Sequence, residues 1–165
     1  MTVAAYPTLN GYAPSWADIS TSATIYGGPL LEMAAYKSLD WSSTVEEGRQ
    51  KGASGGRDMY RTTGQVKYAA KATLFRNGLR VLERGLMAMA PTRGNQRLIS
   101  LVGFDILVQH TPPGELDIFV VKLVGCRLLS DAETYTEGVE AETADVELNP
   151  MYITKLIDGA EVVLL

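Results

Sequence analysis

The stretch QVKYAAKATLF, residues 65–75, alternates between apolar and polar side chains and leads directly into a helical pattern. Alternation with a period of two is typical of an antiparallel strand that buries one face and exposes the other. The side chains expected on the buried face are those of Val66, Tyr68, Ala70, Ala72 and Leu74. This strand and the helix after it predict an α+β fold.

A single helix is expected over about residues 78–90. Asn77 before it has the character of an N-cap, and Pro91 and Gly94 end the helical pattern. Gly85 costs about 1 kcal/mol relative to alanine inside a helix, so another element is expected to pack closely there. The apolar stripe at helical spacing consists of Leu79, Leu82, Leu86 and Met89.

Most of the chain after this helix predicts strands. The two longest apolar-rich runs are joined by a Pro-Pro-Gly turn and are apolar on both faces, which is typical of a sandwich, a closed barrel or an interface. The expected strands are residues 97–110, 116–129, 139–149, 151–157 and 161–165. The fold class is therefore mainly β within α+β: an antiparallel β-sandwich or barrel with one flanking helix.

Two segments are expected to lie outside the core. Residues 1–28 show no sustained period of either 2 or 3.6, and they predict an extended arm whose aromatic side chains dock on their own domain or on a neighbouring subunit. Residues 42–58 are rich in glycine and charge. They predict either a long charged loop or a long hairpin anchored by Trp41 and Met59–Tyr60.

Length and composition limit both the domain count and the chemistry. The 165 residues, 1–165, predict a single domain with its core in residues 29–41 and 59–165. One cysteine, Cys126, and one histidine, His110, exclude an intramolecular disulfide framework and a Cys/His zinc cluster within one chain. No phosphate-loop, calcium-loop or catalytic motif is present, so neither an enzyme nor a cofactor site is expected.

Charge is divided into blocks, although the net charge is only −4. Residues 1–48 carry one basic and five acidic groups, residues 49–97 carry eleven and two, and residues 98–165 carry three and twelve. Such blocks either attract another copy of the chain or neutralise each other within one fold. A sequence pI near 5.0 argues against a nucleic-acid-binding protein.

The order of the parts resembles a known family. EEGRQKGASGGRDMYRTTGQ leads into VKYAAKATLF and then into NGLRVLERGL; FDILVQH, KLVGCRLLSD and GVEAETADVELNPMYI follow. This order resembles the tail tube proteins of tailed bacteriophages, particularly the contractile-tailed ones, and the related tubes of pyocins and type VI secretion. The resemblance covers roughly residues 20–158.

The resemblance implies a structural virion protein that forms stacked, hexameric rings around a channel for DNA. It implies sheath, baseplate and tape-measure proteins as further partners, with no membrane and no cofactor. It also implies a place in the phage tail, assembled in the host cytoplasm. Residues implied to stack rings are Glu46, Glu47, Arg49, Lys51, Arg57 and Asp58. Residues implied in an inter-subunit arm are Tyr6, Tyr12 and Trp16. Residues implied to line the lumen are Glu140, Glu142, Asp145 and Glu147.

Two alternatives stay open at this stage. The long aromatic arm suits a tube initiator, terminator or baseplate ring protein that forms one ring and stops. A small ligand-binding or enzymatic β-barrel would instead use Asp105 and His110, which are isolated polar groups on apolar strands.

Overall fold

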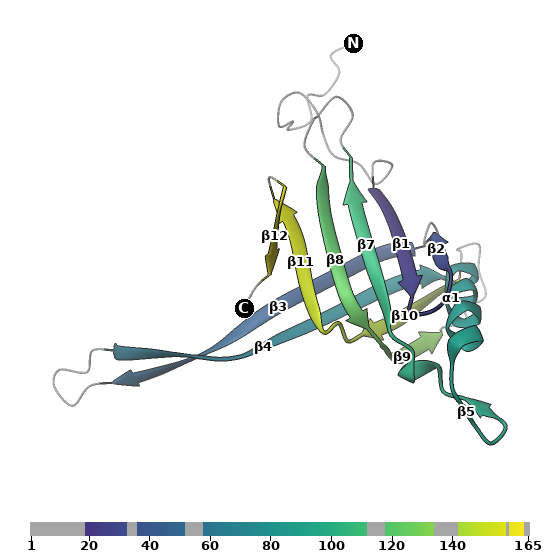
Figure 1. Ribbon diagram of the computed structural model, residues 1–165, viewed down its shortest axis with the longest axis horizontal. Helices are drawn as coiled ribbons and strands as arrows, with labels where there is room; N and C mark the ends of the chain where they lie inside the picture. Colours follow the sequence, from purple (N-terminus) through teal and green to yellow (C-terminus); the bar gives the residue numbers. More distant parts are fainter. Residues whose placement is uncertain are drawn as a thin grey trace, which may run out of the picture.

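The computed structural model describes residues 19–32, 36–51, 58–111, 118–133, 142–157 and 159–163. Two antiparallel sheets pack against each other, one helix lies at one end of the sandwich, and a long hairpin projects from the other end (Figure 1). This is the α+β, mainly β architecture that the sequence predicts. None of the helices in the described part of the chain has the length and apolarity needed to cross a bilayer.

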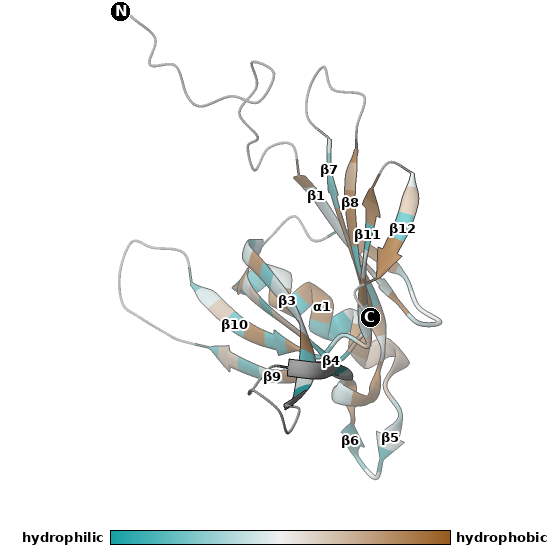
Figure 2. Cartoon of the chain, turned by 90° about the vertical axis from the view of Figure 1, so that its left-hand side faces the viewer, coloured by the Kyte–Doolittle hydropathy of each residue, from teal (hydrophilic) through white to brown (hydrophobic). Residues whose placement is uncertain are grey.

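The larger sheet has six strands in the order β12-β11-β8-β7-β1-β2, and all neighbours are antiparallel. Its strands are β1 (Ile19–Ile25), β2 (Leu30–Glu32), β7 (Phe104–His110), β8 (Phe119–Cys126), β11 (Tyr152–Ile157) and β12 (Ala160–Val163). One end of this sheet stands clear of the smaller sheet, as the two views in Figures 1 and 2 agree.

The smaller sheet has four strands in the order β3-β4-β10-β9. Its strands are β3 (Tyr36–Lys51), β4 (Asp58–Phe75), β10 (Thr143–Leu148) and β9 (Leu128–Glu133). The remaining elements are helix α1 (Arg76–Met89), the short 3-10 helix η2 (Ile99–Leu101) and a ribbon of β5 (Thr92–Arg93) and β6 (Gln96–Arg97).

The core lies between the two sheets and under α1. The alternation in residues 65–75 is confirmed, since Ala70, Ala72 and Leu74 are almost fully buried in β4. Burial of such apolar side chains is the main favourable contribution to folding. The other nearly inaccessible core side chains come from β1, α1, β7, β8 and β10: Ala23, Ile25, Leu79, Leu82, Leu86, Phe104, Ile106, Leu123 and Val146.

Helix α1 confirms Leu79, Leu82 and Leu86 of the predicted stripe and the close approach at Gly85, whereas Met89, the fourth predicted member, is 40% exposed at the end of the helix. A Cβ at Gly85 would lie 2.6 Å from Cδ1 of Ile25 and 2.8 Å from Cδ1 of Leu31, so a larger side chain would displace β1 and β2 contacts. The predicted cap is wrong. Phe75 occupies the N-cap position without a side-chain hydrogen bond, and Asn77 lies inside the helix because β4 continues into it without a loop.

The predicted arm of residues 1–28 is too long. Ile19–Ile25 form β1, which is an inner strand of the six-stranded sheet. Buried Thr21, Ala23 and Ile25 alternate with small polar residues, so the apolar signal of β1 is weak although one of its faces is buried. The arm can therefore include at most residues 1–18, which lie outside the described residues.

Two other predicted segments are divided differently in space. The run 97–110 is interrupted by η2, and only Phe104–His110 form β7. The run 116–129 bends at Arg127, so β8 belongs to one sheet and β9 to the other. Gly125, with φ of 65°, and reciprocal backbone hydrogen bonds between Arg127 and Asn149 make this corner.

Candidate assembly surfaces

The β3–β4 hairpin extends far beyond the sandwich (Figure 1). Its register continues from Tyr36↔Leu74 near the helix to Lys51↔Asp58 at the outer end. The predicted loop of residues 42–58 is thus mostly strand, which corrects the loop alternative in favour of the hairpin. The two strands pair through their backbones, and this pairing needs no apolar core to be satisfied.

The six residues expected to stack rings fall on this hairpin as far as the structure describes them. Glu46, Glu47 and Arg49 are exposed on β3, and Lys51 is paired in register with Asp58 at the outer end. Arg57 lies outside the described residues. The stacking role itself stays a prediction.

The middle of the hairpin contains an irregularity that requires glycine. The β3–β4 register shifts between Val45 and Glu47. A Cβ added at Gly64 would lie 2.8 Å from the carbonyl oxygen of Glu46. Because that oxygen belongs to the backbone, the contact cannot be relieved by rotating a side chain. Next to it, Lys67 forms an ion pair with Glu46 across the two strands.

The face of the four-stranded sheet that points away from the core is polar. On this face Lys71 Nζ lies 3.0 Å from Glu147 Oε1, and the hydroxyl of Thr73 donates a hydrogen bond of 2.7 Å to Asp145. The hydrogen bond and charge of Lys71 lower the pKa of Glu147. The register places the following side chains on the same face: Ser38, Asp40, Ser42, Thr44, Lys67, Ala69 and Ser130.

The four residues expected to line a lumen do not all lie together. Asp145 and Glu147 share the polar face of β10. Glu142 precedes β10 and pairs with Arg76 at the start of α1, away from the strand positions. Glu140 lies outside the described residues. Salt bridges such as Lys71–Glu147 also show that the basic and acidic sequence blocks partly neutralise each other within the fold.

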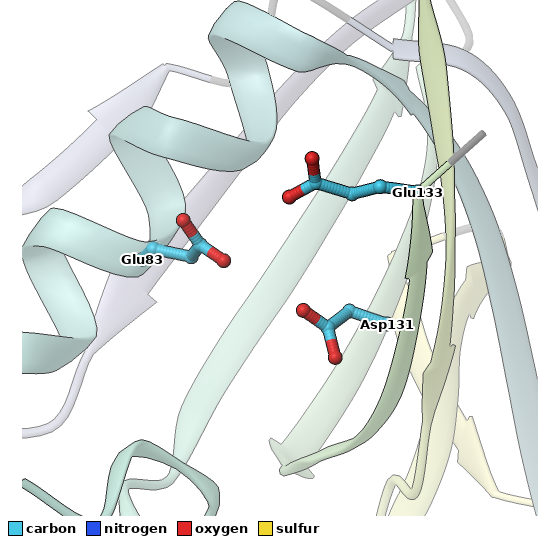
Figure 3. A group of neighbouring side chains, drawn as sticks. All are labelled: Glu83, Asp131 and Glu133. Carbon is cyan, nitrogen blue, oxygen red and sulfur yellow. The ribbon is translucent and has the colours of Figure 1, made fainter. Parts of the chain in front are cut away.

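A group of three carboxylates lies where α1 faces β9 (Figure 3). One carboxylate oxygen from each of Glu83, Asp131 and Glu133 lies within 4.8 Å of the other two. Arginines compensate part of this charge: Arg80 Nη1 lies 3.7 Å from Glu83, and Arg76 Nη2 lies 3.5 Å from Glu133. The group therefore serves as a polar contact between helix and sheet.

The outer face of the six-stranded sheet carries a different polar cluster, centred on Asp105. Tyr26 Oη donates a hydrogen bond of 2.6 Å to Oδ1, and the backbone N–H of Gly125 donates one of 2.9 Å to the same oxygen. Lys122 Nζ lies 3.2 Å from Oδ2. Burial alone would raise the pKa of Asp105, but these donors hold the pKa below its usual value. The hydrogen bond to Asp105 raises the pKa of Tyr26 to about 12.

The structure places the two residues suggested for an enzymatic barrel, Asp105 and His110, on different faces of the six-stranded sheet. Asp105 and His110 are five positions apart on β7, so their side chains point to opposite faces of the sheet. Cys126 is fully buried, and burial raises the pKa of its thiol to about 12, which removes it as a nucleophile. Tyr26 and Lys122 were not singled out by the sequence because they meet Asp105 only through strand pairing.

The comparisons with known proteins agree with this fold. No protein-family model and no curated protein sequence matches the chain. Among solved structures, the tube-terminating cap of the anti-feeding prophage aligns with a TM-score of 0.60 and 12% identity, over 94% of this chain and 98% of that one. The sixfold-symmetrised baseplate of the same particle gives 0.59 and 11%, over 88% and 97%.

A sheath–tube complex of the PVC extracellular contractile injection system also aligns, with a TM-score of 0.53 and 12% identity over 93% of both chains. The chain therefore has the fold of contractile-tail tube proteins, as the sequence resemblance implies. These neighbours come from the cap and the baseplate of the anti-feeding prophage and from the sheath–tube complex of an extracellular contractile injection system. At such low identities, the likeness concerns the fold, and function has to be argued from the surfaces.

Proposed function

We propose that this chain, with its tube-protein fold, is a tail tube subunit that assembles with copies of itself into stacked rings around a channel. The observation that carries this proposal is the four-stranded sheet, which has a polar outer face and two edge strands that pair with no further strand in the described part of the chain. Its edge strands are β3 and β9. Unpaired edges are templates for pairing with another chain.

The strand directions suit a closed ring. Each neighbouring pair in the order β3-β4-β10-β9 is antiparallel, so β3 and β9 run in opposite directions. If β9 of one copy pairs with β3 of the next, the antiparallel pattern continues across the junction. Such a head-to-tail contact closes into a ring when the rotation per copy is right. Six copies per ring is the proposed number, in keeping with the sixfold baseplate among the structural neighbours.

The polar face of this sheet would then line the channel. Its lysines are not available as single positive charges, because Lys71 pairs with Glu147 and Lys67 pairs with Glu46. Asp145 and Asp40 add further negative charge to the face. Nonspecific nucleic-acid affinity comes mainly from cationic contacts to phosphates, so this surface favours the passage of DNA without retention.

The hairpin and the N-terminal arm would connect subunits. The outer half of the hairpin, with Glu46, Glu47 and Arg49, reaches beyond the sandwich and presents charges of both signs to the next ring. The aromatic residues Tyr6, Tyr12 and Trp16 would contribute an inter-subunit contact. Sheath, baseplate and tape-measure proteins are the proposed further partners, in a phage tail assembled in the host cytoplasm.

The test is to shorten the hairpin without disturbing the sheet. Val45 pairs with Val66, so residues 46–65 are replaced by an Asn-Gly turn that joins this pair directly. We expect a folded subunit with unchanged circular dichroism that no longer forms stacked rings in negative-stain electron microscopy. The matched control grafts the same Asn-Gly turn in place of Gly94–Asn95 in the β5–β6 ribbon and should still assemble. Normal tubes from the shortened hairpin would contradict the stacking role.

A tube initiator or terminator is the second candidate. The observation that favours it is that the structural neighbours include a tube-terminating cap and a baseplate as well as a sheath–tube complex. A terminator forms one closed ring of constant size, whereas a bulk subunit continues into filaments as its concentration rises. Light scattering over a concentration series separates the two.

A further inference from the structure

Burial on the inner face of the six-stranded sheet falls steadily from one end to the other. The register aligns Ala23, Ile106, Leu123 and Ile153 in one row, and all of them are nearly inaccessible. The next row ends in exposed Val162 on β12. The last row contains Ile19, His110 and Phe119. The sheet therefore extends past the part that the four-stranded sheet covers (Figure 2).

The uncovered end forms a distal apolar patch, which we define as Phe119, Val121, Ile157 and Val162. Phe119 is 58% exposed, Ile157 52% and Val162 47%, although all three lie on the face that elsewhere forms the core. Val121 is half-buried between them and the core. Exposed Lys155 of β11 lies on the same face, in register between Val121 and Val162, so the apolar side chains surround one lysine. Exposed apolar side chains on the core side of a sheet indicate a surface that another segment covers.

His110 adds a polar feature to the same place. Its ring stacks on Phe119, with centroids 6.2 Å apart and planes inclined by 25°. Within the described part of the chain, Nε2 of His110 is buried and has no hydrogen-bond partner. A segment that covers the patch can supply the missing partner from a hydroxyl or a backbone group.

We propose that the N-terminal residues 1–18 of the same chain cover the distal apolar patch, with their aromatic side chains against Phe119. This segment joins the sheet at Ile19, which lies in the same row as His110 and Phe119. Residues 1–18 are therefore attached to the sheet directly beside the surface that they would cover.

The reach of the segment is sufficient. Trp16 precedes Ile19 by three positions, and this length of chain spans about 10 Å when extended. Phe119 lies two strands away from Ile19, which is also about 10 Å, and β11 is one strand farther. Tyr12, seven residues from Ile19, reaches about 23 Å and so extends beyond β12.

The size of the patch favours a tethered segment over a second globular subunit. Four partly exposed side chains present roughly a few hundred Å² of apolar surface. A stable interface between separate proteins needs roughly 800 Å² per partner. A covalently attached segment needs less, because its effective concentration is high. The same site would accept the segment of a neighbouring copy if the arms exchange on assembly.

The experiment uses limited chymotrypsin digestion of the dilute full chain, with mass spectrometry to assign each cut. The segment carries its own cleavage sites after Tyr12 and Trp16, whereas Pro7 protects the bond after Tyr6. We expect slow cleavage in the parent. The double change Phe119→Ser with Val162→Ser should accelerate it about tenfold or more, since proteolysis follows the population of the open form.

Leu156→Ser is the matched control, because Leu156 lies on the opposite face of β11 and is also partly exposed. It should leave the cleavage rate unchanged. If the melting temperature of the double variant is markedly lower than that of the parent, the single change Val162→Ser on edge strand β12 replaces the double variant in the experiment. Equal cleavage rates in parent and patch variants would overturn the proposal. So would protection that disappears on dilution, since the occupant would then be another copy. None of these outcomes depends on whether the chain forms tubes.

Discussion

The two sheets carry carboxylates on their outer faces in very different settings. On the six-stranded sheet, the side chain of Asp105 is only 17% exposed and receives three donors from two separate segments, the turn at Tyr26 and strand β8. On the four-stranded sheet, the side chain of Glu147 is 51% exposed and its closest cation, Lys71, is 72% exposed. The first carboxylate is part of the fold, and the second belongs to a surface.

The different settings of Asp105 and Glu147 indicate different roles for the outer faces of the two sheets. A network with several donors around a half-buried charge fixes the positions of β7, β8 and the Tyr26 turn relative to one another. An exposed ion pair contributes little to stability but sets the local charge of the surface. The outer face of the four-stranded sheet can therefore serve a passing or binding partner without risk to the fold.

The largest effect is expected from Asp105→Ala, because it leaves Tyr26, Lys122 and the N–H of Gly125 without their acceptor. The free energy of unfolding should fall by about 2 kcal/mol. Asp145→Ala, on the exposed face of β10, is the control and should change it by no more than about 0.5 kcal/mol. Chemical denaturation of both variants measures the contrast. Similar losses in the two would show that both carboxylates are equally structural.

Tyr26→Phe should have a smaller effect that depends on pH. The loss of one hydrogen bond to a partly exposed carboxylate should cost about 1 kcal/mol at neutral pH. The pKa of Tyr26 is raised from 10.0 to about 12 in the folded chain. Its contribution is thus complete below pH 10 and is lost as the pH rises toward 12.

The difference in unfolding free energy between parent and Tyr26→Phe should therefore shrink between pH 10 and 12. Denaturation at pH 8, 10 and 11.5 measures this trend, and the other tyrosines cancel in the comparison. A difference that stays constant over this range would mean that the Tyr26–Asp105 bond does not control the titration.

The smallest effect on stability is expected from Glu147→Gln, which should leave the melting temperature unchanged. The substitution releases Lys71 on the face proposed to line the channel, and retention of the chain on immobilised DNA at low salt should increase several-fold. Glu161→Gln removes the same charge from β12 of the other sheet and is the control. An equal increase in both variants would indicate a net-charge effect and not a property of this face.

Local patterns predicted the elements whose burial follows one simple period. The alternation of residues 65–75, the stripe with Leu79, Leu82 and Leu86, and the apolar residues of β10 all occupy the core as expected. These elements pack on one face only, so their sequence period matches their burial. By contrast, β1 buries threonine and alanine, and no hydrophobic pattern marks it.

The candidate surfaces were only partly predictable. Glu147 and Asp145 were selected as acidic residues of one strand, and they do share a face. Their neighbours Lys71 and Thr73 come from a strand about seventy positions earlier, and the hydrogen bond from Tyr26 to Asp105 joins residues 79 positions apart. Such partners depend on strand register, which sequence spacing does not encode.

By itself, the sequence determined the class of the fold, the position of the helix and the polar, charged character of the segment that forms the hairpin. These are local properties, because period, turn residues and composition act within a few residues along the chain. Only the tertiary structure decided that residues 116–129 divide between two sheets, that β3 and β9 are edge strands of opposite direction, and that the four-stranded sheet leaves one end of the six-stranded sheet uncovered. Those properties arise from the pairing of distant strands, and the free energy that selects one pairing is spread over the whole core.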